Sequence, residues 1–314
     1  MEQRKLIQHG RSSLTIALPA KWIKQYGLLK GESVYVSEEG QQLIVSTDQS
    51  TKIGKISVDI SHLDRTSALL YIQSLYRFGY NEIEVNFRKP KTVHYRKGEE
   101  VRISTLMHYT MNRLIGFEIV EQSPKRILIK QVAKEAGEDF TVILRRVFLL
   151  MKETSASLLE GIRINDHNLI SSVEEKHDNI TKFVTYCLRL LNVHGYPDVK
   201  KTCFYYHIIA SLDKIVDILK YNARDAIKYD KNFHKDSVKI LFLIHDSLVK
   251  YYELFYKFNY KKVDELSENR DKTKNLLQKK AKNVPVEELL YLTSHKQILE
   301  ILLDLTDSRM GLEY

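Results

Sequence analysis

From about residue 138 onward the chain is a series of long amphipathic segments without any strand pattern, and this feature constrains the fold most. Apolar residues recur with helical spacing over 140–164, 167–193, 198–229, 232–258, 261–282 and 285–311. Short polar, glycine or proline breaks such as Asn165-Asp166 separate these segments. Antiparallel helices with connections this short form a bundle. The sequence therefore predicts an all-α domain of six helices over 138–314.

The six predicted helices divide into two repeats of three, at about 138–230 and 231–314, because an acidic pattern occurs twice. On the third helix of each repeat two acids stand four residues apart, so they share one helix face. These pairs are Asp213 with Asp217, and Glu300 with Asp304. The second helices carry further acids, which are Glu174, Glu175 and Asp178 in the first repeat and Glu268 and Asp271 in the second.

Carboxylates stacked on one helix face repel each other, so a compensating charge is expected. Acids that converge from neighbouring helices would form an oxygen-rich site for a divalent or iron cation. The candidate metal ligands are Glu175, Asp178, Asp213, Asp217, Glu268, Asp271, Glu300 and Asp304. The alternative is that these acids are solvated and pair with nearby lysines. His177, beside Asp178, is interpreted as a surface residue, with a role as a mixed metal ligand as the alternative.

The first 46 residues have a different pattern, that of a small strand-rich module. Apolar and small or polar residues alternate over 13–18, Pro19 stops this strand, and 20–26 can form two helical turns that end at Gly27. Strands are expected at 33–36 and 43–45. So short a module buries too little apolar surface to fold alone, which predicts that a second copy completes its core. Residues 1–30 hold six lysines and arginines against one acid, which favours an anionic partner.

This module resembles the SpoVT/AbrB swapped-hairpin DNA-binding domains. The resemblance rests on Gly10-Arg11-Ser12-Ser13-Leu14-Thr15-Ile16-Ala17-Leu18-Pro19-Ala20-Lys21-Trp22, followed by Gly27-Leu28 and Lys30-Gly31-Glu32. It implies a dimeric swapped-hairpin β-barrel over 1–46 that binds DNA. The residues expected at the DNA are Arg4, Lys5, Arg11, Ser12, Ser13, Lys21 and Lys24. The alternative is a module that only joins two chains.

The helical repeats resemble the PhoU family of phosphate-uptake regulators, whose acid pairs hold metal clusters. Asp213 with Asp217 and Glu300 with Asp304 match that family's motif, although Asp213 stands where glutamate is usual. Leu302-Leu303 also depart from the residues that the family has between its acids. An AbrB-like module followed by PhoU-like repeats is similar to a class of archaeal phosphate-uptake or transcriptional regulators.

Between these regions, residues 52–133 predict a small α+β middle domain. Strands are expected at 55–60, 82–87, 117–121 and 126–131, with helices at 64–78 and 101–114. No glycine-rich phosphate loop and no catalytic triad spacing is present in the sequence, so no enzyme is predicted. Arg88-Lys89-Pro90-Lys91 and Tyr95-Arg96-Lys97 are interpreted as exposed loop charges, and a second nucleic-acid surface is the alternative.

The composition of the whole chain limits the possible partners and compartment less strongly. A net charge of +9 favours an anionic partner only moderately. The two cysteines lie in helical contexts and the chain starts with polar residues, which predicts a cytoplasmic protein. No apolar run is long enough to span a membrane, so no membrane insertion is expected.

The fold class expected is therefore multidomain α+β, and the function expected is that of a homodimeric transcription regulator of phosphate uptake with a helical sensor that can bind metal. The main alternative is an adaptor that dimerises through its N-terminus and docks on a phosphate transporter subunit, a kinase or another signalling protein. A metal-dependent enzyme is the weakest option.

Overall fold

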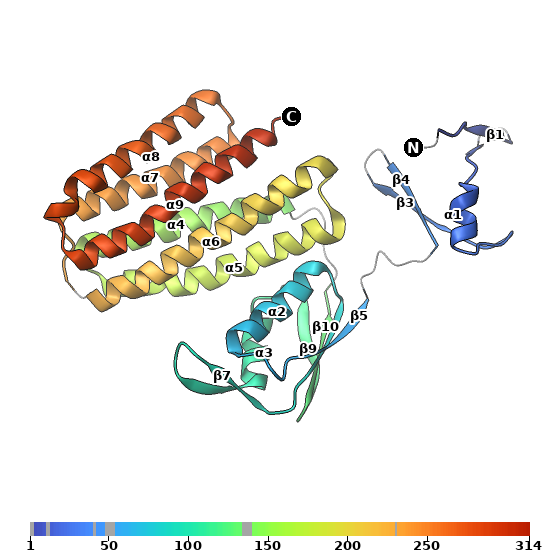
Figure 1. Ribbon diagram of the computed structural model, residues 1–314, viewed down its shortest axis with the longest axis horizontal. Helices are drawn as coiled ribbons and strands as arrows, with labels where there is room; N and C mark the ends of the chain where they lie inside the picture. Colours follow the sequence, from blue (N-terminus) through green and yellow to red (C-terminus); the bar gives the residue numbers. More distant parts are fainter. Residues whose placement is uncertain (1–2, 11–12, 40–41, 48–53, 134–139, 230) are drawn as a thin grey trace. The chain divides into compact units, whose positions relative to one another are not determined.

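The computed structural model describes residues 3–10, 13–39, 42–47, 54–133, 140–229 and 231–314 (Figure 1). Arg11 and Ser12 of the expected DNA-binding set lie outside these residues. The chain divides into two compact units, Met1–Lys52 and Ile53–Tyr314. The second unit contains both the predicted middle domain and the predicted helical domain.

The first unit has the expected order of short strands around one short helix. Its elements are β1 (Ile7–His9), β2 (Ser13–Thr15), α1 (Ala20–Gln25), β3 (Tyr35–Glu39) and β4 (Gln42–Ser46). β1 pairs with β2 and β3 with β4, both antiparallel. Gly27 follows α1 with a φ of +64°, the left-handed conformation that glycine adopts at little cost. The first predicted strand ends at Thr15, earlier than the alternation to residue 18 suggests.

The second unit begins with a four-stranded sheet in the order β5-β6-β10-β9. β5 and β6 are parallel and joined by a helix, and the other pairs are antiparallel. The bounds are β5 (Lys55–Asp59), α2 (Arg65–Phe78), β6 (Glu82–Asn86), α3 (Ile103–Met111), β9 (Phe117–Ser123) and β10 (Arg126–Gln131). Alternate strand residues such as Val58, Ile83, Val85, Ile127 and Ile129 are buried with residues of α2 and α3, as the period of two predicts.

Two further strands, β7 (Lys91–His94) and β8 (Glu99–Arg102), form an antiparallel hairpin. The interpretation of Arg88-Lys89-Pro90-Lys91 as loop charges is wrong for Lys91, which lies in a strand. The pattern was hard to detect because each strand has four residues and only Val93 and Val101 are aliphatic. A hairpin this short is held by its neighbours, and Thr92 Oγ1 donates to the carbonyl of Leu63 at 2.7 Å.

The remainder of the unit is helical, as predicted, and its helices lie side by side (Figure 1). They are α4 (Phe140–Ile164), α5 (His167–His194), α6 (Val199–Tyr229), α7 (Lys235–Tyr256), α8 (Tyr260–Lys280) and α9 (Val286–Gly311). Each predicted bound lies within three residues of the observed one, because helical periodicity and breaks are local signals. None of the helices in the described ranges is both long and apolar enough to cross a lipid bilayer.

Helix α5 joins the helical region to the sheet through a buried arginine. Arg189 is 1% exposed, and its guanidinium donates to the carbonyls of Tyr76 at 2.6 Å and Tyr80 at 3.0 Å. It also donates to Asn81 Oδ1 at 2.8 Å. Tyr76 is in the last turn of α2, where a cation is favoured by the helix dipole. Arg189 is therefore one of the side chains that link α5 to α2 and to β10, where its guanidinium also reaches Gln131 Oε1 at 3.4 Å.

Candidate functional site

The first unit has no core of its own in the residues that the structure describes. None of its described side chains is buried, and Leu14 and Leu43 are 63% and 65% exposed. The predicted half-buried face of Leu14 and Ile16 is therefore not covered within one chain. The exposed large apolar residues of the unit are Leu6, Ile7, Leu14, Ile16, Tyr26, Leu29, Tyr35, Val36, Leu43 and Ile44. A small module that leaves ten large apolar side chains exposed is typical of one that is covered by a partner.

The described residues of the expected DNA-binding set are all exposed on this unit. Arg4 and Lys5 precede β1, and Ser13 begins β2. Lys21 and Lys24 stand three residues apart on α1, so they share one face of that helix. The structure thus places two expected phosphate contacts together, on a short helix that no buried residue anchors within the chain.

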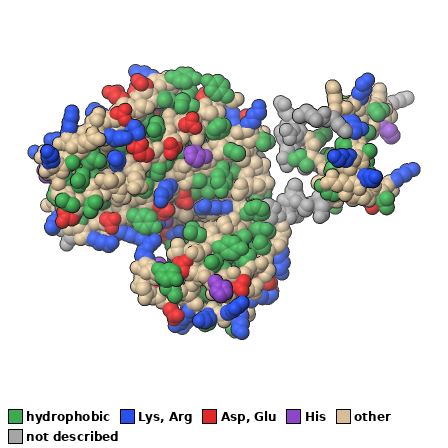
Figure 2. Space-filling view, in the orientation of Figure 1, with side chains coloured by type: hydrophobic (Ala, Val, Ile, Leu, Met, Phe, Trp, Pro, Cys, Tyr) green, Lys and Arg blue, Asp and Glu red, His purple; other side chains and the backbone are tan. Residues whose placement is uncertain are grey.

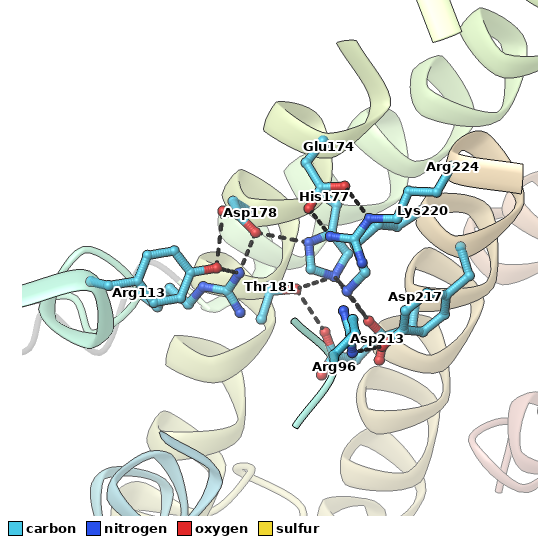
Figure 3. Close-up of polar contacts among 12 residues, drawn as sticks. Arg96, Arg113, Glu174, His177, Asp178, Thr181, Asp213, Asp217, Lys220 and Arg224 are labelled. Carbon is cyan, nitrogen blue, oxygen red and sulfur yellow. Dashed lines mark hydrogen bonds and ion pairs between the residues drawn. The ribbon is translucent and has the colours of Figure 1, made fainter. Parts of the chain in front are cut away.

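In the second unit, the acids of the first helical repeat meet around a buried histidine (Figure 3). His177 of α5 is 1% exposed, so its interpretation as a surface residue was wrong. Its Nδ1 lies 2.9 Å from Asp178 Oδ1, and its Nε2 lies 3.0 Å from Asp217 Oδ1 of α6. Thr181, one turn further along α5, donates to Asp213 Oδ1 at 3.1 Å. Three of the predicted metal ligands therefore lie in one network.

Cations of this chain already face those carboxylates. Lys220 Nζ is 2.6 Å from Asp217 Oδ1 and 2.8 Å from His177 Nε2. Arg113, which follows α3, binds Asp178 and Tyr109. Arg77 of α2 lies 3.4 Å from Asp213 Oδ2 and donates to Thr185 Oγ1 at 2.9 Å. Two of the three cations thus come from the sheet region and dock it onto α5 and α6.

The close contacts shift the titration of the cluster. Burial alone lowers the pKa of His177, but its hydrogen bonds to Asp178 and Asp217 outweigh burial and raise it. Burial raises the pKa of Asp213, aided by the Asp217 carboxylate and opposed by Arg77. Burial also tends to raise the pKa of Asp217, yet His177 and Lys220 hold it below its usual value.

The hydrogen-bond partners of His177 therefore depend on whether its ring is protonated. As an imidazolium, the ring donates to both Asp178 and Asp217. As a neutral ring with its proton on Nδ1, it keeps the bond to Asp178 and accepts one from Lys220 at Nε2. The cluster can therefore change its internal bonding without a change in which helices meet.

The acids of the second repeat do not form an equivalent network. Glu300 of α9 binds Arg270 of α8 at 2.5 Å and Lys274 at 3.2 Å, and Arg270 also binds Asp271. Glu268 is exposed and lines a groove between α7 and α8 together with Asp271. Asp304 is exposed and lines a separate groove with His207. In the first repeat Glu175 is exposed as well, because it lies two residues before His177 and so on another helix face.

The chemistry of this donor set does not fit a bound metal in the arrangement seen. Within the described ranges, no three His, Cys, Asp or Glu side chains are placed to hold an ion together. The carboxylates of Asp178, Asp213 and Asp217 each face a lysine or arginine instead. A metal ion at this position would require those cations to withdraw first.

Sequence reasoning identified the acids but missed their partners. Arg77 is 136 residues from Asp213 and Arg113 is 65 residues from Asp178. No local spacing connects such pairs. Lys220 is the exception, because it stands three residues after Asp217 and on the same helix face.

We expect His177→Gln to lower the free energy of unfolding by about 1–3 kcal/mol below pH 6, since carboxylates lose a charged partner. The folded-state pKa of His177 is raised, so its extra stabilisation is complete below the unfolded pKa of about 6.5 and is lost as pH rises through the folded pKa. The difference from wild type should therefore shrink toward pH 9 in urea titrations. His62→Gln, at an exposed position, is the control. A pH-independent difference would show that His177 does not titrate in this range.

Comparisons of the chain with models of known protein families, with curated proteins and with solved structures find no match.

Proposed function

We propose that this chain is a DNA-binding transcription regulator that acts as a homodimer through its first unit. The observation that carries the proposal is the coreless first unit, which combines uncovered apolar strands with exposed cations on α1. A second copy would bury the apolar strands and place two sets of Lys21 and Lys24 on one particle. Residues 10–32 resemble swapped-hairpin DNA-binding domains, and this resemblance indicates that the anionic partner of the cations is DNA.

The second unit is proposed to supply the signal. Its charged cluster joins α2 and the segment after α3 to α5 and α6 through Arg77 and Arg113. A ligand or proton that changes the pairing of Asp178, Asp213 or Asp217 would alter how the sheet is held. The PhoU-like repeats make phosphate uptake the proposed process. A metal remains part of this proposal only as a competitor that displaces Arg77, Arg113 or Lys220.

The DNA-binding role is tested by Lys21→Ala/Lys24→Ala in the full chain. Each lost phosphate contact should reduce the slope of log K against log salt concentration by about 0.9 for duplex DNA. A dimer that loses four cations should therefore lose up to about 3–4 in slope. Binding to genomic fragments, followed by sequencing, would identify the preferred site. An unchanged slope and an unchanged set of enriched fragments would remove DNA binding from the first unit.

One observation favours an adaptor as the second candidate. Val286 and Leu290 are each 69% exposed and four residues apart on α9, so they present one apolar face to solvent. A partner protein could cover that face while the first unit only joins two chains. No enrichment of any genomic fragment at physiological salt would favour the adaptor over the regulator.

A further inference from the structure

The β7–β8 hairpin and the turns beside it concentrate positive charge on the second unit. Residues 88–102 hold six lysines and arginines against two glutamates, although the whole chain carries only +9. Lysine and arginine side chains gather along the lower edge of this unit in Figure 2. We call the following exposed residues the basic strip: Arg88, Lys89, Lys91, Lys97, Arg102 and Lys125.

The fold brings these residues together from three separate segments. The amide of Phe87 donates to the carbonyl of Lys125 at 3.0 Å, which places the β9–β10 turn beside Arg88. Lys91 and Arg102 are directly paired across the hairpin. Lys97 lies in the turn at the other end, where its amide donates to the carbonyl of His94. The strip therefore runs from the end of the sheet along the hairpin to its tip.

Several of these cations are not neutralised by the protein. Lys91 pairs with Glu100, and Lys97 with Glu99. By contrast, Lys89, Arg102 and Lys125 form no ion pair with any residue in the part of the chain that the structure describes. The strip thus retains net positive charge after its internal pairs are taken into account.

Like charges are also held close at both ends of the hairpin. Lys91 stands directly opposite Arg102, and like charges opposite each other destabilise a strand pair. At the tip, burial lowers the pKa of His94, and the nearby cations Arg65, Lys97 and Arg96 lower it further, while the Glu99 carboxylate opposes them. An anionic partner would relieve the repulsion between Lys91 and Arg102.

We propose that the basic strip is a second contact surface for the phosphate backbone of duplex DNA. The three residue-to-residue steps from Lys91 to His94 span about 10 Å, and each DNA strand carries one phosphate per about 3.4 Å of helix axis. The strip is thus long enough to meet several phosphates. Contacts of lysine and arginine with phosphates carry no sequence information, so the proposed contacts are independent of sequence. This inference rests on the proposed function and extends it, since a second contact on one chain raises affinity through avidity.

The test compares two triple variants of the full chain on duplex DNA of arbitrary sequence. Lys89→Ala/Arg102→Ala/Lys125→Ala removes three unpaired cations from the strip. Lys200→Ala/Lys279→Ala/Lys282→Ala removes the same charge from exposed positions of the helical region. The strip variant should bind DNA at least about 10-fold more weakly at low salt. The slope of its log K against log salt concentration should fall by about 2–3 per chain bound. The helical variant should match wild type.

A further comparison separates this proposal from DNA binding by the first unit. In the Lys21→Ala/Lys24→Ala background, the strip substitutions should still lower the remaining affinity. If they do so while Lys21→Ala/Lys24→Ala has no effect of its own, the strip binds DNA and the first unit does not. If the strip variant binds DNA like the helical control, the proposal is wrong. Vesicles containing phosphatidylglycerol serve as a second probe, and loss of vesicle binding with unchanged DNA binding would assign the strip to a lipid surface instead.

Discussion

Arg189→Met should lower the free energy of unfolding of the second unit by about 3 kcal/mol or more. The guanidinium is buried and donates to the carbonyls of Tyr76 and Tyr80 and to the side chain of Asn81. Methionine fills a similar volume but donates no hydrogen bond, so these buried acceptors lose their charged partner. Urea unfolding followed by circular dichroism measures the change.

Two further variants make this prediction specific to the buried arginine. Arg163→Met removes an arginine that pairs with Glu160 at the surface, and it should change the unfolding free energy by less than about 0.5 kcal/mol. Arg189→Lys keeps the charge but cannot reach all of these acceptors at once, so its stability should lie between those of wild type and Arg189→Met. If Arg189→Met is as stable as Arg163→Met, the guanidinium does not hold α5 to the sheet.

On the proposed function, Leu14→Asp should disrupt the proposed dimer and weaken the proposed DNA binding by about 100-fold or more, because the two DNA contacts would lose their linkage. Leu14 lies in β2, is 63% exposed in the single chain and belongs to the apolar surface proposed to be covered by a second copy. A buried aspartate without a partner is strongly unfavourable at such an interface. Analytical ultracentrifugation gives the mass, and a binding titration gives the affinity.

The matched control is Val142→Asp, which places the same charge at another exposed apolar residue, on α4. It should leave both the mass and the DNA affinity unchanged. A Leu14→Asp protein that remains dimeric would show that the chains associate through another surface. A wild-type protein that is monomeric at all concentrations would overturn the dimer itself.

The sequence allowed a good prediction of the helical region and a poorer one of the short strands. The helices α4 to α9 follow from apolar residues repeated over six or more turns, and Gly195 or Asn165-Asp166 mark their ends. The β7–β8 hairpin has only four residues per strand, and its lysines and glutamates obscure the alternation. Charged residues in so short a strand resemble a loop until their neighbours in space are known.

Only half of the candidate site, its acids, could be predicted from the sequence. The acids of the first repeat were found, because residues four apart on a helix share a face whatever the helix packs against. Their cations were missed, and with them the reason why a metal does not fit the arrangement seen. Four of the eight predicted ligands, which are Glu175, Glu268, Asp271 and Asp304, are exposed and lie outside the His177 network.

Local sequence patterns are enough to predict which segments are helices, which residues share a helix face and that the first unit is too small to bury a core. These properties depend on residues within a few positions of each other or on composition alone. The packing of the elements, by contrast, buries His177, brings Arg77 and Arg113 to distant carboxylates, and assembles the basic strip from three segments. Each of these features depends on which faces of the helices and strands meet in space. Contacts between residues 65 or 136 positions apart produce no periodic pattern in the sequence.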